Sequence, residues 1–177
     1  MSRTRLEASP RRLWAMLSLL WLMNGCAAGR VTPVGPFPFI DPPFKTIALA
    51  PNGGIFADVL GMALEGQGYT MIDTGATLAV LLMMQTPPES LLSPEVMASL
   101  NERGIDAVLV VRKRDGKDGL PQTAYIRLHR TEPVMDVGGI DWENSWVRRG
   151  TLEAVQEIAA AMKPGALSPP HLAAQGP

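Results

Sequence analysis

The pattern of apolar and polar positions begins to specify regular structure at residue 44. Residues 44–50 (Phe-Lys-Thr-Ile-Ala-Leu-Ala) form a nearly continuous apolar run, which is typical of a strand inside a sheet. Residues 55–64 carry apolar side chains at helical spacing, and Asn52 in the turn before them can cap that helix. A second short strand follows at residues 69–73. Strand, helix and strand in this order predict a right-handed βαβ unit with parallel strands.

The middle of the chain predicts two more helices and an inner strand. Residues 76–85 are apolar nearly all round, so we expect this helix to be fully buried or covered by another chain. Ser93-Pro94-Glu95 supplies the cap, the proline and the carboxylate of a helix start, and Gly104 ends that helix. Residues 105–111 (Ile-Asp-Ala-Val-Leu-Val-Val) predict a strand, and the charged residues 112–121 predict a solvated loop.

Two further strands and a last helix complete the pattern. Residues 122–130 alternate between apolar and polar side chains, as a half-buried strand does. Residues 134–146 return as a longer strand or a bent hairpin arm around Gly138-Gly139, and residues 152–162 predict a helix. The predicted fold class is therefore α/β with mixed α+β character: an open mixed β-sheet with a βαβ start, an antiparallel meander and packed helices.

The N-terminal segment has the features of an export signal. Four arginines precede an apolar run of eleven residues, 13–23, which is too short to cross a bilayer of roughly 30 Å. The run ends at Asn24-Gly25, and the only cysteine of the chain, Cys26, follows directly. This arrangement resembles a bacterial lipoprotein signal, which implies cleavage after Gly25 and lipidation of Cys26. Met23 and Asn24 stand where that motif usually has Leu and a small residue. The alternative is an ordinary cleavage after Ala28, which would release a soluble periplasmic protein.

We divide the chain into four parts on this basis. Residues 1–25 are a lipoprotein signal peptide, and residues 26–43 are a lipidated, proline-rich tether, of which the fifteen residues 27–41 could span about 45 Å at about 3.1 Å per residue. Because this segment also contains Val34, Phe37 and Phe39, we expect part of it to pack on the body or on a partner. Residues 44–163 form a periplasmic α/β domain, and residues 164–177 form a disordered tail.

The domain pattern resembles a known group of periplasmic domains. Two stretches are similar to CsgG-like and LpoB-like envelope lipoproteins: residues 44–69, with the Ile-Ala-Leu-Ala strand, its helix and the Gly-x-Gly-Tyr end, and residues 104–111, which begin with Gly-Ile-Asp-Ala-Val-Leu-Val. Residues 142–146 give weaker support. The resemblance implies a non-catalytic accessory protein of the cell envelope. The long transmembrane hairpins of the channel-forming members have no counterpart here, so pore formation is not implied.

Charge and cysteine content exclude several classes of protein. Without residues 1–25, the chain has 12 Lys and Arg against 16 Asp and Glu, a net charge of −4. Nucleic acid is therefore not an expected partner, because phosphate binding needs a clustered basic face. If Cys26 carries lipid, no thiol remains for a disulfide, an iron–sulfur cluster or a thiolate zinc site. We predict no metal and no cofactor.

The polar residues of the body do not form a recognisable catalytic set. His129 lies on the outer face of a predicted strand and His171 lies in the tail, so neither has a predicted acid–base partner. Asp141 and Glu143 share one strand face, which we interpret as an exposed face and not as a metal site. Trp142, Trp146 and Tyr125 are the residues that we predict to contact a partner.

These observations predict a non-catalytic, lipid-anchored envelope lipoprotein at the periplasmic face of the outer membrane. Its partners are the membrane, through the N-terminal lipid, and either another envelope protein or a second copy of itself. Ala27 after Cys26 is compatible with outer-membrane sorting, as the resemblance to lipoproteins implies. The alternatives are a hydrolase acting on cell-wall or lipid material, and a soluble periplasmic binding module.

Overall fold

A computed structural model describes residues 28–35, 44–146 and 148–163 of the chain. Its strands are β1 (Arg30–Val34), β2 (Thr46–Leu49), β3 (Thr70–Ile72), β4 (Ala107–Asp115), β5 (Pro121–Thr131) and β6 (Val134–Glu143). Its α-helices are α2 (Gly54–Glu65), α3 (Thr74–Met83), α4 (Pro94–Glu102) and α5 (Thr151–Ala161), with short 3-10 helices η1 (Pro51–Gly53) and η2 (Pro88–Ser90). Among these residues, no helix is long and apolar enough to cross a membrane.

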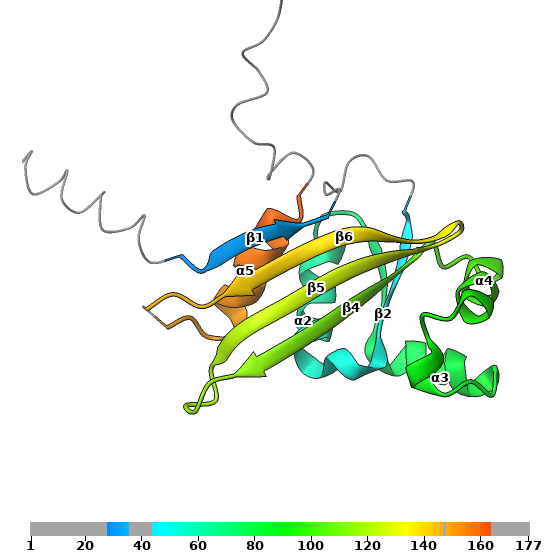
Figure 1. Ribbon diagram of the computed structural model, residues 1–177, viewed down its shortest axis with the longest axis horizontal. Coiled ribbons are helices and arrows are strands. Elements are labelled where there is room, and N and C mark those ends of the chain that lie inside the picture. The colour runs from blue at the N-terminus through cyan, green and yellow to red at the C-terminus, as the bar shows by residue number, and fades with distance from the viewer. Residues whose placement is uncertain (1–27, 36–43, 147, 164–177) are drawn as a thin grey trace, which may run out of the picture.

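All six strands belong to one sheet in the order β1-β6-β5-β4-β2-β3 (Figure 1). β2 is parallel to both β3 and β4, whereas β4, β5, β6 and β1 pair antiparallel with one another. The predicted fold class is therefore confirmed: the sheet is open and mixed, β2, α2 and β3 form the expected βαβ unit, and β4, β5 and β6 form the meander.

The edge strand β1 lies inside the range that we predict to be a tether. It pairs antiparallel with β6, with Val31 opposite Trp142 and Arg30 opposite Glu143. Pro33 fits because an edge strand has one side without ladder hydrogen bonds. The tether prediction is thus corrected for residues 30–34, in line with the expectation that part of this segment packs on the body. The signal peptide with Gly25, the lipidation residue Cys26, and the predicted tail at residues 164–177 lie outside the described residues.

The inner face of the sheet is covered along its length by α2 and α5 (Figure 1). Apolar side chains from β2, β4, β5 and β6 meet those of the two helices in one buried cluster. Its largest fully buried member is Trp142 on β6, which is 1% exposed. Burial of this kind contributes roughly 25 cal/mol per Å² of apolar surface, so this layer carries most of the stability of the body.

Among the described residues, the outer face is covered at one end only, by α3 and α4. A second apolar cluster joins these helices to Ala48 on β2 and to Val108 and Val110 on β4. In α3 only Thr77 and Leu81 are buried, whereas Leu82 and Met83 are 65% and 80% exposed. The uniformly apolar sequence of this helix therefore does not reflect burial within the described part of the chain.

The region predicted to be a solvated loop, residues 112–121, is mostly strand. β4 continues through Arg112 to Asp115 and pairs with β5 along this length. Only residues 116–120 form the turn between the two strands. The prediction is wrong here because a run of charged side chains hides the alternation of a strand that leaves the core.

Candidate functional site

The first candidate feature is the place where the N-terminal segment joins the body. The backbone N–H of Gly29 donates to Glu157 Oε2 on α5 at 2.9 Å, and Trp142 Nε1 donates to the same oxygen at 2.8 Å. The other oxygen, Glu157 Oε1, lies 3.4 Å from Arg149 Nε. We call Gly29, Trp142, Arg149 and Glu157 the anchor junction, because they fix the main chain three residues after Cys26.

Gly29 is required in this junction because the backbone approaches the indole closely. A Cβ atom at this position would lie 2.5 Å from Glu157 Oε2 and closer still to Trp142 Nε1. The indole of Trp142 is 1% exposed and held in the core, so it has no room to move away from an added Cβ atom. The junction therefore combines a steric fit with a charge-assisted hydrogen bond.

The segment that follows β6 lies next to this junction. Glu143, the last residue of β6, is opposite Arg30 of β1. Asn144 Nδ2 donates to the carbonyl oxygens of Pro121 and Arg149, and Asn144 Oδ1 accepts from the backbone N–H of Arg149. Trp146 lies in this segment and is 80% exposed. An indole is thus presented to solvent close to the point where the N-terminal segment enters the sheet.

The structure separates the three residues that we predict to contact a partner. Trp146 and Tyr125 are on the surface, the latter at 44% exposure. Trp142 is 1% exposed, because its ring points to the inner face of the sheet and packs with α5. The prediction for Trp142 is therefore corrected: its role is in the core and in the anchor junction.

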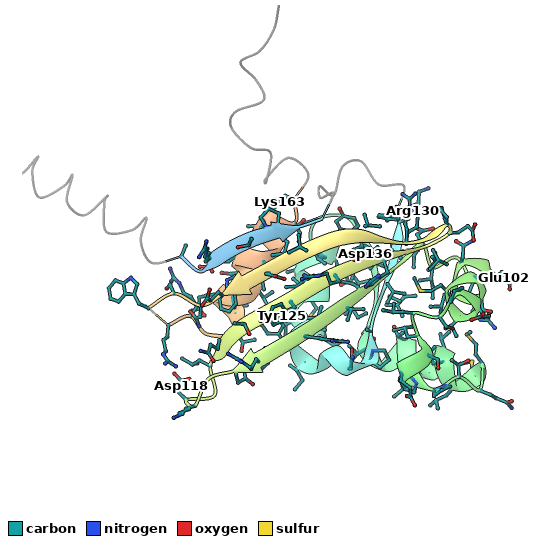
Figure 2. The ribbon with its side chains drawn as sticks, in the orientation of Figure 1. Glu102, Asp118, Tyr125, Arg130, Asp136 and Lys163 are labelled. Carbon is teal, nitrogen blue, oxygen red and sulfur yellow. The ribbon has the colours of Figure 1, made fainter. Side chains whose placement is uncertain are left out.

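The second candidate feature is the part of the outer sheet face beyond α3 and α4, which we call the open face. Strand register places polar side chains there in rows across neighbouring strands: Arg112 of β4 is opposite Tyr125 of β5, which is opposite Asp141 of β6. The next row joins Arg114, Thr123 and Glu143. Within the described ranges no helix covers these rows, and Figure 2 shows Tyr125 in the middle of this face.

A groove of about 530 Å³ runs along the open face beside the α3–α4 connection. Leu92 and Val110 form its apolar part, and Tyr125 and His129 line its other wall. The residues that bring positive charge are Arg112, Arg114 and Arg127. Lys113 also lines the groove, but its ammonium group lies 5.9 Å from the centre of the Phe56 ring, towards the inner face. None of the lining residues is a carboxylate, although Glu89 lies in the hollow that adjoins the groove at Leu92.

Arg127 lies flat on the open face because Gly139 on β6 leaves room for it. A Cβ atom at Gly139 would overlap the carbonyl oxygen of Ile126 and would lie 2.9 Å from Arg127 Cδ. Through that space Arg127 Nη1 donates to the carbonyl oxygens of Ile126 and Ile140, at 2.8 and 3.2 Å. Its Nη2 forms an ion pair with Asp141 Oδ1 at 2.6 Å.

His129 contributes little charge to this face at neutral pH. Burial lowers the pKa of His129 from its usual value near 6.5, the carboxylate of Asp136 partly opposes this, and Arg127 adds to it. Asp141 and Glu143 share the open face as the sequence predicts. Over the described residues, no group of three His, Cys, Asp or Glu side chains is placed to hold a metal ion.

Comparisons with known proteins give similarity at the level of structure only. No family model and no curated protein matches the sequence. The PelC dodecamer from Paraburkholderia phytofirmans is similar over 76% of this chain and 94% of its own, with 15% identity and a TM-score of 0.45. Lipoprotein GNA1162 from Neisseria meningitidis is similar over 60% of this chain and 81% of its own, with 20% identity and a TM-score of 0.43. One similar structure is thus a bacterial lipoprotein, whereas the resemblance to CsgG-like and LpoB-like domains stays a prediction.

Proposed function

We propose that this protein is a non-catalytic envelope lipoprotein, anchored by lipid on Cys26 at the periplasmic face of the outer membrane, that binds another envelope protein. The anchor junction is the observation that carries this proposal. A chain attached to lipid at residue 26 would be fixed to a folded body at residue 29, through the carboxylate of Glu157 that also holds Trp142 and Arg149.

The short connection has a consequence for the position of the body. Three residues span at most about 10 Å between Cys26 and Gly29, in contrast to the roughly 45 Å that a free tether would allow. The body would then rest against the headgroups. Trp146 would lie within reach of the interface, where indole rings are favoured because one edge is polar and the rest apolar.

The open face supports a binding role. It presents guanidinium groups, a phenol and apolar side chains around a groove, and such side chains are enriched in protein interfaces. Arginine makes directional, bidentate contacts with carboxylates, and tyrosine combines an apolar ring with a hydroxyl group, which suits a binding surface.

The anchoring is tested by replacing the thiol. We expect the parent to incorporate labelled palmitate, to begin at Cys26 by mass spectrometry and to fractionate with outer membranes. Cys26→Ser should lose all three properties. A variant that matures and partitions with membranes as the parent does would contradict the proposal, and a mature N-terminus at Gly29 would establish the soluble alternative.

The position of the body is tested by fluorescence quenching. After cleavage behind Gly25, the protein retains only Trp142 and Trp146. In vesicles that contain brominated phospholipids, we expect Trp146 to be quenched and the buried Trp142 to act as an internal reference. Trp146→Phe should remove the quenched component. Insertion of a flexible Gly-Ser segment between Ala28 and Gly29 should reduce the quenching, whereas equal quenching with and without the insertion would contradict a fixed, short connection.

A further inference from the structure

The groove on the open face has a charge that the rest of the body does not share. The chain from Cys26 onward has a net charge of −4, yet the groove collects cations without a carboxylate among its lining residues. A local positive site on a negatively charged protein disfavours non-specific attraction of anions at long range. It selects ligands that reach the groove itself.

Two of the cations are available for a ligand. Arg112 and Arg114 are exposed, and no ion pair to either is found among the described residues. Within the described part of the chain, the side-chain hydrogen bond of Arg114 is a long one, 3.5 Å from its Nη2 to Gln122 Oε1. The charge of Arg127 is shared with Asp141, and Lys113 pairs with Asp115 at 2.7 Å. The unshared positive charge of the groove is therefore that of Arg112 and Arg114.

The spacing of these two arginines fits an extended chain. Residues two apart on a strand point to the same face and are separated by roughly 6.6 Å. Carboxylates on alternate residues of an extended peptide have the same separation. Each guanidinium can hold one carboxylate through two parallel hydrogen bonds, which a single lysine cannot do.

The apolar part of the groove adds a second requirement. Leu92 is 40% exposed and Tyr125 is 44% exposed, and Val110 joins the two in the lining of the groove. An apolar side chain placed before the two carboxylates would be covered by these residues. A groove that combines apolar side chains with two arginines fits a peptide segment. A bilayer surface is contacted by side chains that project from a protein, not by a concave site.

Neither residues 36–43 nor residues 164–177 of this chain supply a segment with two such carboxylates. Residues 164–177 contain no Asp and no Glu, and residues 36–43 contain a single Asp. We propose that the groove binds an extended acidic segment of a partner protein, with carboxylates at alternate positions on Arg112 and Arg114 and an apolar side chain against Leu92, Val110 and Tyr125. This deepens the proposed function and rests on it, because it names the chemistry of the partner.

The test uses the mature lipoprotein in detergent and a labelled peptide with Leu, Glu and Glu at alternate positions. We expect fluorescence anisotropy to show saturable binding, and a peptide with Gln in place of both Glu residues to bind at least about tenfold more weakly, since hydrogen bonds to charged groups are the stronger ones. Arg112→Gln with Arg114→Gln should weaken binding by a similar factor, and Tyr125→Ala by about threefold to tenfold.

The matched control is Arg103→Gln with Lys163→Gln, which removes the same charge from exposed positions at the ends of α4 and α5. It should bind the acidic peptide as the parent does. Equal binding by the parent and the Arg112/Arg114 double variant would overturn the proposal. So would loss of binding in the control double variant, which would indicate a general charge effect.

Binding of a different ligand in the groove would overturn the proposal of an acidic segment, and each alternative ligand gives its own result. Binding of phosphatidylglycerol vesicles that depends on Arg112 and Arg114, without peptide binding, would assign the groove to lipid. Self-association in sedimentation experiments that is lost in the same double variant, again without peptide binding, would assign it to a second copy. Membrane fractionation of the double variant separates the two proposals, because it should remain anchored through Cys26 whatever the groove binds.

Discussion

The two faces of the sheet differ in what covers them, although the same strands form both. Along β5, the side chains of Ala124, Ile126 and Leu128 are at most 1% exposed, because α2 and α5 lie over them. Tyr125 and Arg127, between them in sequence, point to the open face. Alternation along a strand therefore predicts that two faces exist, but the placement of the helices decides that only one of them is sealed.

The difference between the faces is measured most directly by neighbouring substitutions. Ile126→Ala should lower the free energy of unfolding by about 2–4 kcal/mol, because it leaves a cavity in the inner layer. Tyr125→Ala, one residue away, should change it by about 1 kcal/mol or less, since its side chain is 44% exposed and has only cross-strand neighbours to lose. Urea denaturation of both variants gives the two values. A loss of several kcal/mol for Tyr125→Ala would mean that the open face is covered in the intact protein.

Gly139 shapes the open face, because its missing side chain lets Arg127 lie across the neighbouring strand. Gly139→Ala should lower the free energy of unfolding by about 1–3 kcal/mol, since the new methyl group would collide with the carbonyl oxygen of Ile126. Gly66→Ala at the end of α2 is the control, because its backbone is helical and its new Cβ would make ordinary contacts. Thermal unfolding should show a lower Tm for the first variant and an unchanged or higher Tm for the second.

We expect the anchor junction to stabilise β1 locally, on the face of the sheet that α2 and α5 cover. Glu157→Gln replaces the carboxylate that accepts from two N–H groups by a neutral amide and removes the charge that faces Arg149. We therefore expect the free energy of unfolding to fall by about 1–2 kcal/mol. Hydrogen exchange should accelerate mainly in β1. Gln156→Ala, the exposed neighbour on α5, should leave both quantities unchanged. Uniform acceleration across the sheet would show that Glu157 supports the whole fold and not the junction.

His129 should give the smallest effect, seen as a dependence on pH. Its pKa is lowered in the folded protein, mainly by burial, so the unfolded chain takes up a proton at higher pH. Neutral His129 contributes to the free energy of unfolding. This contribution is fully present above about pH 6.5, and it is lost as the pH falls from there through the lowered pKa of His129 in the folded protein. Denaturation between about pH 5 and 8 should show a shallower slope for His129→Gln than for the parent.

The sequence predicts the fold well where apolar periodicity is strong. The βαβ unit, the α4 start at Ser93-Pro94 and the two strands of the meander follow from local patterns, and the structure places them in one mixed sheet. The pattern fails where a strand leaves the core: β4 continues through Arg112 and Arg114. Residues 112–115 are all charged, so no apolar–polar alternation marks this part of the strand, and only its pairing with β5 reveals it.

The candidate site is predicted only in part, for a physical reason. Tyr125 and Trp146 are identifiable because large aromatic side chains at polar positions are conspicuous. Glu157 is not, because its role depends on Gly29, which is 128 residues away in the sequence. Trp142 cannot be assigned to the inner face without the register that pairs it with Val31 and Ala124.

The position of β1 also bears on how the protein could leave the membrane. If Cys26 carries lipid as proposed, the strand nearest the lipid is part of the sheet, and a protease that cut between β1 and β2 would separate that strand covalently from the rest of the body. The shed fragment would then carry a bare β6 margin, with backbone donors and acceptors open to pairing with other chains. Under the proposed lipid anchoring, cleavage at that connection would therefore not release an intact sheet, and a body that had lost β1 would be prone to aggregation.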